Sequence, residues 1–254
     1  MQKKVVVTTQ PADQAREMLR LLSQQGFQAY NLPMIKTQTR KISDDQINAV
    51  TQPGQYQLLV FTSKKGVRGL FENLMQRKAS YALAPGLKTA VVGPGTHSEL
   101  KNYGLEADYI NPGKTAEDLA AFLQEKAIQP GHKVLLALGN NAPDFLQENL
   151  GPKASVQRIN VYKTIPLPVT DVKTERLIRE QKADLCIFTS PSGFHNFLHI
   201  FGQTNKLKLA AIGSTTADAI REAGYDPTVI ANSPSAQSLV QAINDYFAKQ
   251  NSKT

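Results

Sequence analysis

Short apolar runs alternate along the chain with stretches in which apolar residues recur at helical spacing. The valine-rich run at residues 4–8 predicts a strand, and residues 12–25 predict a helix that ends at Gly26. Further strands are predicted at residues 27–32, 57–61, 88–92, 107–110, 133–138, 155–161, 184–188, 208–212 and 228–230. Further helices are predicted at residues 66–75, 96–103, 116–125, 144–150, 174–181, 193–201, 216–223 and 236–248. This alternation predicts an α/β fold built on parallel sheets.

Motifs in the first half of the chain recur in the same order in the second half. The matched pairs are Phe61-Thr62-Ser63 with Phe188-Thr189-Ser190, residues 92–96 with 212–216, Gly104 with Gly224, and residues 115–119 with 235–239. The last three pairs share one offset of 120 residues (92 to 212, 104 to 224, 115 to 235). An ordered set of matches indicates one structural unit that is used twice.

Two segments, residues 33–41 and 162–171, interrupt the alternation. They contain proline, threonine and scattered charge without a helical period, which is typical of extended connectors. A length of 254 residues also favours two domains. We therefore predict a discontinuous first domain of residues 1–35 plus 172–254, a second domain of residues 38–163, and connectors near 33–41 and 162–171.

Charge and composition narrow the class of partner. The chain has 29 Lys and Arg against 21 Asp and Glu, a net charge of +8, which attracts anions. The positive residues are scattered, and no zinc-finger spacing or aromatic RNA-binding signature is present, so an acidic metabolite is favoured over nucleic acid. No run approaches the roughly 18 apolar residues of a membrane span, and no signal peptide is evident. The single cysteine, Cys186, lies in an apolar run that predicts a buried strand and an inert thiol, so we expect a cytoplasmic protein.

Hydroxyl and glycine residues follow four of the predicted strands and precede helices. Each such place offers a hydroxyl, free backbone N–H groups and the positive end of a helix, a combination suited to carboxylate or phosphate. The same residue types are also ordinary helix caps, and that alternative stays open. The candidate binding residues are Thr62, Ser63, Gly93, Thr96, Thr189, Ser190, Ser192, Gly213 and Thr216.

Other chemistries have weaker support in the sequence. Residues 93–95 lack the third glycine of a dinucleotide fingerprint, and no GxxxxGK[ST] loop is present. His195 and His199 lie one helical turn apart but have no evident third metal ligand, and His97 and His132 have no recognisable partner. A nucleotide- or sugar-phosphate-binding protein remains an alternative on fold analogy alone.

Tyr162 is the remaining candidate for chemistry. It follows the predicted strand end at Val161 and opens the second connector, and its hydroxyl can donate a proton to a leaving oxygen. The alternative is a half-buried connector tyrosine without a chemical role.

These motifs resemble the uroporphyrinogen-III synthase family of tetrapyrrole biosynthesis over nearly the whole chain. The resemblance is carried by FTSKKGVRGLF, VVGPGTHSELKNYGL, the Val161-Tyr162 pair, LCIFTSPSGFHNF, AAIGSTTADAIREAGY and PSAQSLVQAI. It implies two flavodoxin-like domains joined by a two-stranded extended connector, with an anionic substrate held in a cleft between the domains. It also implies that a linear tetrapyrrole with eight carboxylates, hydroxymethylbilane, is cyclised with inversion of ring D and loss of water. The family acts without a metal or organic cofactor, usually as a monomer.

The resemblance also implies roles for particular residues. Tyr162 matches the tyrosine proposed to assist departure of the ring-A hydroxyl, and Ser63, Thr96, Ser190 and Thr216 match residues around the cleft.

The sequence departs from the family pattern at three positions. Gln10 stands where the family often has arginine, and Leu138 precedes Gly139 where an Arg-Gly pair is common. A second family arginine lies near the position of Pro143. Because lost arginines remove carboxylate clamps, a relative that binds a tetrapyrrole without turning it over is an alternative.

Overall fold

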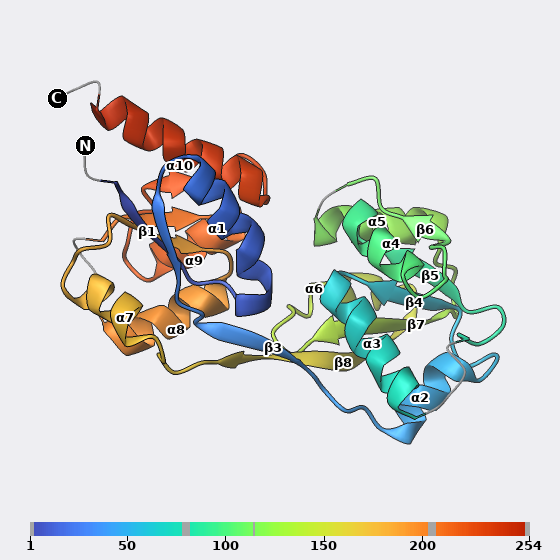
Figure 1. Ribbon diagram of the computed structural model, residues 1–254. Coiled ribbons are helices and arrows are strands. Elements are labelled where there is room, and N and C mark those ends of the chain that lie inside the picture. The colour runs from blue at the N-terminus through green and yellow to red at the C-terminus, as the bar shows by residue number, and fades with distance from the viewer. Residues whose placement is uncertain (1–2, 78–81, 114, 203–206, 252–254) are drawn as a thin grey trace. The chain divides into compact units, whose positions relative to one another are not determined.

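A computed structural model describes residues 3–77, 82–113, 115–202 and 207–251 (Figure 1). The chain forms two compact units, which we describe separately. Unit 1 comprises Met1–Lys36 and Ile165–Thr254, and unit 2 comprises Thr37–Thr164. Each unit contains a parallel sheet covered by helices, so the predicted α/β fold is confirmed. Within the residues described, no helix combines the length and apolar character needed to cross a bilayer.

The sheet of unit 1 has the strand order β11-β10-β9-β1-β2. All of its neighbouring strands are parallel. Numbered along the chain this order is 2-1-3-4-5, the flavodoxin-like arrangement. The strands are β1 Val5–Thr8, β2 Gln28–Asn31, β9 Leu185–Phe188, β10 Leu209–Ala211 and β11 Val229–Ile230. The helices are η1 Ala12–Gln14, α1 Ala15–Gln24, α7 Val172–Arg179, α8 Pro191–Phe201, α9 Ser214–Glu222 and α10 Ala236–Asn251.

Alternating residues of the unit 1 strands pack on opposite faces of the sheet. Val6 faces one core with α1 and α10, whereas its neighbour Val7 faces a second core with α7, α8 and α9. Cys186 belongs to the second core and is fully buried. Burial raises the pKa of the Cys186 thiol far above its ordinary value, so this cysteine is the inert core residue that its apolar run predicts.

The sheet of unit 2 has the strand order β3-β8-β7-β4-β5-β6. Its strands from β8 to β6 pair in parallel. The strands are β3 Ile35–Thr39, β4 Leu58–Phe61, β5 Lys88–Val91, β6 Tyr109–Ile110, β7 Lys133–Gly139 and β8 Ser155–Pro166. The units meet along the chain within β3 and β8, and these two neighbouring strands contain much of both segments predicted as extended.

The helices of unit 2 cover both faces of this sheet. One core includes residues from α2, α3 and α4, and the other includes residues from α5 and α6. The helices are α2 Asp44–Thr51, α3 Lys64–Gln76, α4 Pro94–Lys101, α5 Ala116–Lys126 and α6 Phe145–Leu150.

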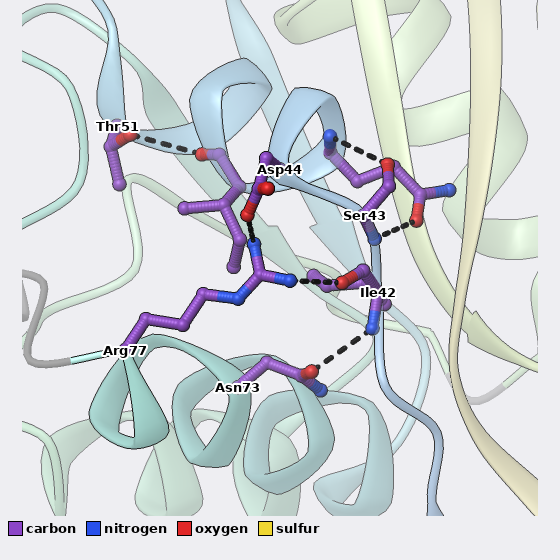
Figure 2. Close-up of polar contacts among 8 residues, drawn as sticks. Ile42, Ser43, Asp44, Thr51, Asn73 and Arg77 are labelled. Carbon is purple, nitrogen blue, oxygen red and sulfur yellow. Dashed lines mark hydrogen bonds and ion pairs between the residues drawn. The ribbon is translucent and has the colours of Figure 1, made fainter.

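Helix α2 was not predicted from the sequence pattern. It begins with a capping box, in which the Ser43 hydroxyl accepts from the Gln46 N–H at 3.2 Å and the Gln46 side chain accepts from the Ser43 N–H at 3.0 Å. Figure 2 shows this cap together with neighbouring polar contacts of Asn73 and Arg77. The spacing Ser-x-x-Gln before Ile47 was therefore an available signal for a helix start.

The chain entering α2 is fixed to the C-terminal half of α3 (Figure 2). Buried Asn73 accepts from the Ile42 N–H at 3.1 Å and donates to the Arg40 carbonyl at 2.9 Å. Arg77 donates to the Ile42 carbonyl at 2.7 Å and pairs with Asp44. These contacts tie the segment that leaves β3 to α3, the helix that follows the candidate residues Thr62 and Ser63.

The repeat found in the sequence is reproduced in the geometry of the two units. The Ser63 hydroxyl accepts from the Gly66 N–H at 3.1 Å, and the Ser190 hydroxyl accepts from the Gly193 N–H at 3.2 Å. Both serines have nearly the same backbone angles, φ −160° and ψ 155° against φ −161° and ψ 152°. Further matched positions are the N-caps Gly93 and Gly213, the left-handed residues Gly104 and Gly224, and the capping hydroxyls of Thr115 and Ser235. Corresponding strands also occupy corresponding places, because β8-β7-β4-β5-β6 matches β2-β1-β9-β10-β11.

Candidate active site

The strand order of unit 2 reverses between β7 and β4. In open parallel sheets, ligands bind beyond the carboxyl ends of the strands at such a switch point. Strand β4 ends at Phe61 and is followed by Thr62 and Ser63, while β7 ends at Gly139. The sequence-predicted residues Thr62 and Ser63 therefore lie where this fold class places its ligands.

Tyr162 lies at the same switch point. Its hydroxyl oxygen is 3.5 Å from the Ser63 hydroxyl oxygen, and its half-buried ring lies directly against the backbone of Gly139. The expectation that Tyr162 follows the end of a strand was wrong, since β8 continues to Pro166. Pairing extends through this region because Asn140 N–H donates to the Tyr162 carbonyl at 3.1 Å and the Asn140 side chain accepts from Thr164 N–H at 2.9 Å.

Ser63 is a helix cap that also lies beside Tyr162. It is the N-cap of α3, and its oxygen accepts from Gly66 N–H at 3.1 Å. Its own hydroxyl proton can still be donated, and Tyr162 is a partner within reach. The cap fixes the Ser63 side chain beside the tyrosine, and a role of Ser63 in binding stays a prediction.

The starts of α3 and α4 form a positive edge beside these residues. The first turn of α3 contains Lys64 and Lys65 and no acidic residue, although the positive end of a helix favours acidic ones. The Lys64 side chain extends over Gly95 in the first turn of α4, with Cε 3.2 Å from where a Cβ on Gly95 would lie. The exposed Lys64 ammonium is therefore close to two helix N-termini, an arrangement that favours an anion.

An ion pair fixes α3 against α4. Arg68 donates to both carboxylate oxygens of Glu99, at 2.7 and 2.8 Å, and the Glu99 side chain is only 8% exposed. The hydrogen bond from Arg68 holds the pKa of Glu99 below its ordinary value, with burial opposing the shift. This pair sets the relative placement of the two helix starts within unit 2.

Unit 1 has a corresponding group of hydroxyl residues and helix starts at the carboxyl edge of its own sheet. Thr189 and Ser190 follow β9, and the Ser190 hydroxyl lies 3.3 Å from the Ser192 hydroxyl. Gly213 is the N-cap of α9 and is followed by exposed Ser214. Here too, hydroxyls and helix N-termini gather at the carboxyl ends of the strands.

The two predicted threonines in the first helical turns are not open to solvent. Thr96 is 5% exposed and Thr216 is 3% exposed, as expected for residues that pack α4 and α9 onto their sheets. Gly93 is buried, whereas Thr62, Thr189, Ser190, Ser192 and Gly213 are half-buried. A direct role for Thr96 and Thr216 in binding stays a prediction.

Arg158 of unit 2 was not singled out from the sequence, whereas Gln10 of unit 1 was noted only as a departure from the family pattern. Arg158 donates to the carbonyls of Gly139 and Ala142 and so holds the loop after β7. Gln10, at a position where the family often has arginine, is buried, and its amide nitrogen has no hydrogen-bond partner in the described part of the chain. No periodicity distinguishes Arg158 from an ordinary surface residue, so only the fold reveals its contacts.

The four histidines were considered as metal ligands. Among residues 3–77, 82–113, 115–202 and 207–251, no three His, Cys, Asp or Glu side chains are grouped to hold an ion. His195 and His199 lie on α8. His97 contacts Glu106 at 2.7 Å and His132 accepts from Gln129 N–H at 3.3 Å, two hydrogen bonds that were not recognisable from the sequence.

A hollow of about 370 Å³ lies elsewhere in unit 2. Leu58, Lys88 and His132 in its lining stand at or just before the starts of β4, β5 and β7. It is thus at the amino edge of the sheet, opposite the carboxyl edge that carries Ser63 and Gly139, and it is not part of the candidate site.

Comparison with known proteins decides the family. The sequence model described as uroporphyrinogen-III synthase HemD matches residues 16–241. This chain belongs to the uroporphyrinogen-III synthase family. The resemblance drawn from the motifs is therefore confirmed.

Relatives of the family match most of the chain at modest identity. The uroporphyrinogen-III synthase of Chlorobaculum parvum is 26% identical over 250 residues, covering 94% of this chain and 98% of that protein. The uroporphyrinogen-III synthase of Schizosaccharomyces pombe is 29% identical over 190 residues, covering 73% of this chain and 74% of that protein.

Solved structures of the family share the fold. A mutant uroporphyrinogen III synthase of Thermus thermophilus matches with a TM-score of 0.69 at 19% identity, covering 97% of this chain and 99% of that one. The uroporphyrinogen-III synthetase of Helicobacter pylori matches with a TM-score of 0.65 at 18% identity, covering 96% of this chain and 99% of that one. The two-domain α/β architecture of the family is thus the architecture of this chain.

Proposed function

We propose that this chain is a uroporphyrinogen-III synthase that cyclises hydroxymethylbilane, with inversion of ring D and loss of water. The observation that carries the proposal, beyond family membership, is the placement of the Tyr162 hydroxyl beside Ser63 at the switch point of unit 2. A proton donor at that place suits a reaction whose first step is departure of a hydroxyl group.

Tyr162 acts as the acid in the proposed mechanism. Its proton passes to the ring-A hydroxyl as the carbon–oxygen bond breaks, and the leaving group departs as water. The electron pair that replaces the broken bond comes from the ring-A pyrrole nitrogen. The Ser63 hydroxyl donates to the phenolate oxygen that forms, since its own oxygen is already bound by Gly66 N–H.

Ring D then attacks through its substituted carbon. The bond from that carbon to the methylene joining rings C and D breaks, and this methylene bonds the free α-carbon of ring D, whose released proton restores the Tyr162 hydroxyl. This sequence depends on how the chain of four rings is folded. Holding both ends of a flexible substrate together converts a rare encounter into a favoured one. The proposed enzyme therefore acts mainly by binding and orientation. The proposed reaction needs a proton donor and a folded substrate, without a metal or organic cofactor.

The carboxylates of the substrate are proposed to bind at the helix starts. In unit 2 these are the first turns of α3 and α4 with Lys64, and in unit 1 they are the first turns of α8 and α9 with Ser190 and Ser192. Backbone N–H groups and the net charge of +8 both favour an acidic substrate over a neutral one. We further propose that the enzyme acts as a monomer in the cytoplasm, a setting that suits its single cysteine.

A second candidate function is a tetrapyrrole-binding protein without synthase activity. Gln10 and Leu138, which stand where the family often has arginine, favour this alternative. Incubation of the purified chain with freshly prepared hydroxymethylbilane separates the two. Rapid formation of uroporphyrinogen III supports the synthase, whereas binding of uroporphyrinogen with formation of isomer I alone supports the binding protein.

A further inference from the structure

The Gly139 backbone lies against the Tyr162 ring, and the Arg158 side chain is bonded to that backbone. We infer that Gly139 and Arg158 are positioning residues for Tyr162: Gly139 leaves the space that the ring occupies, and Arg158 holds Gly139 there. This inference rests on the proposed function, because it concerns the placement of the proposed acid.

A β-bulge turns Tyr162 toward Ser63. Leu138 pairs with Asn160, but the next residue of β7, Gly139, pairs with Tyr162, so Val161 is an extra residue in β8. In a regular strand Tyr162 would lie on the face opposite Val161. Instead Val161 belongs to the core on the α3 side and Tyr162 packs against that same core. A bulge that re-aims one side chain is typical of functional sites.

The bulge is secured from the neighbouring chain segments. The Val161 carbonyl accepts from Arg40 N–H at 2.9 Å, and the Tyr162 carbonyl accepts from Asn140 N–H at 3.1 Å. Both carbonyl groups at the bulge therefore have hydrogen-bond partners, and these bonds fix the backbone of Tyr162 from the segments on either side of β8.

The ring of Tyr162 occupies the space where Gly139 has no side chain. A Cβ on Gly139 would overlap ring carbons of Tyr162 and would lie 2.7 Å from its hydroxyl oxygen. Real Cβ atoms essentially never approach another atom so closely, so an alanine at this position must displace the ring. Because the hydroxyl end of the ring is included in the overlap, the displacement would move the oxygen away from Ser63.

Arg158 fixes the loop that carries Gly139. Its side chain is only 13% exposed. The guanidinium donates to the carbonyls of Gly139 at 2.5 Å and Ala142 at 2.8 Å, to Asp144 at 2.8 Å, and to the Asn160 side chain at 2.7 Å. It thus joins the start and the end of the loop between β7 and α6 to β8, the strand of Tyr162.

These hydrogen bonds also leave Arg158 unable to bind a substrate carboxylate through two parallel N–H groups. Four of the five N–H donors of a guanidinium are committed to protein oxygens, and two of these acceptors are backbone carbonyls. No pair of parallel donors is left to hold a substrate carboxylate. Loss of Arg158 should therefore affect the chemical step through Tyr162 and leave substrate binding nearly unchanged.

The test is a double-mutant cycle measured by the formation of uroporphyrinogen III. We expect Gly139→Ala and Arg158→Lys each to lower kcat by about 10- to 100-fold with KM within about twofold, because a displaced donor loses its alignment while binding groups remain. In a Tyr162→Phe background, neither change should lower kcat further, since the hydroxyl they position is already gone.

Gly151→Ala is the matched control. A Cβ there would lie 2.9 Å from the Gln147 carbonyl oxygen, so the change also crowds the backbone of unit 2, but at the end of α6 and away from Tyr162. Its thermal stability should fall while its kcat stays within about twofold of the parent chain. Should Gly139→Ala fail to fold, Arg158→Lys carries the test alone.

The outcomes separate this inference from the proposed function. A parent chain that forms no uroporphyrinogen III overturns the proposed function itself. An active parent chain overturns the inference if Gly139→Ala and Arg158→Lys keep full kcat, if they raise KM instead, or if they lower kcat equally in the Tyr162→Phe background.

Discussion

The hydroxyl oxygens of Tyr162 and Ser63 lie 3.5 Å apart, although 99 residues separate them along the chain. Ser63 follows β4, and Tyr162 is paired with Gly139 at the end of β7, the strand next to β4. The helix start at Ser63 and the re-aimed tyrosine therefore meet where the strand order reverses.

Replacement of Tyr162 by phenylalanine removes the proposed proton donor and keeps the ring. We expect kcat for uroporphyrinogen III formation to fall by about 10- to 100-fold, near the low end of acid catalysis, because hydroxymethylbilane also loses water unaided. Product binding, measured by fluorescence titration, should change by less than about twofold. Unchanged turnover would remove Tyr162 from the mechanism.

The internal repeat supplies a matched pair of serine variants. Ser63→Ala and Ser190→Ala each remove an N-cap with the same geometry, so each should lower the free energy of unfolding by about 1 kcal/mol. Because the Ser63 hydroxyl lies beside Tyr162, Ser63→Ala should lower kcat, whereas Ser190→Ala should mainly raise KM. Steady-state kinetics and urea denaturation of both variants check this. Equal effects of the two changes on kcat would contradict a special role for Ser63.

A second matched pair tests the packing of α3 on its sheet. A Cβ on Gly66 would lie 2.6 Å from the Ala137 carbonyl oxygen, whereas a Cβ on its counterpart Gly193 would lie 3.3 Å from a serine hydroxyl. Gly66→Ala should destabilise unit 2 by about 1–3 kcal/mol, because backbone must move. Gly193→Ala should stay within about 1 kcal/mol of the parent chain, since better helix propensity offsets the crowding. Thermal denaturation of both variants measures the difference, and a more harmful Gly193→Ala would refute it.

The ion pair between Arg68 and Glu99 predicts a pH-dependent stability. The folded pKa of Glu99 lies below its ordinary value of 4.5, so the pair contributes stability above that value and loses it as the pH falls through the folded pKa. Glu99→Gln should cost about 1–3 kcal/mol at pH 7. The difference in the free energy of unfolding between Glu99→Gln and the parent chain should shrink once the pH falls below the ordinary pKa of a glutamate. Urea denaturation between about pH 7 and about pH 3 measures this, and a difference that grows toward acid would contradict the assigned direction.

The alternation of apolar runs with helical patterns was enough to predict the parallel sheets and most elements. The residue types at Ser63 and Ser190 were enough to offer a helix cap as one interpretation, because a cap is a local feature of a few adjacent residues. Helix α2 was missed although its capping box at Ser43 is equally local.

The immediate surroundings of Tyr162 could not be predicted from the sequence. The bulge at Val161 depends on pairing with β7, and the space above Gly139 exists only once β7 and β8 are adjacent. The role of Arg158 depends on carbonyl groups that the loop after β7 brings to it. Such contacts between distant segments leave no periodic pattern in the chain.

The isomer composition of the product tests the account most directly. Purified chain and freshly prepared hydroxymethylbilane should give mainly uroporphyrinogen III within the time in which the unaided substrate has barely reacted. If the product is isomer I, formed at the rate seen without protein, the proposed placement of substrate and acid is contradicted.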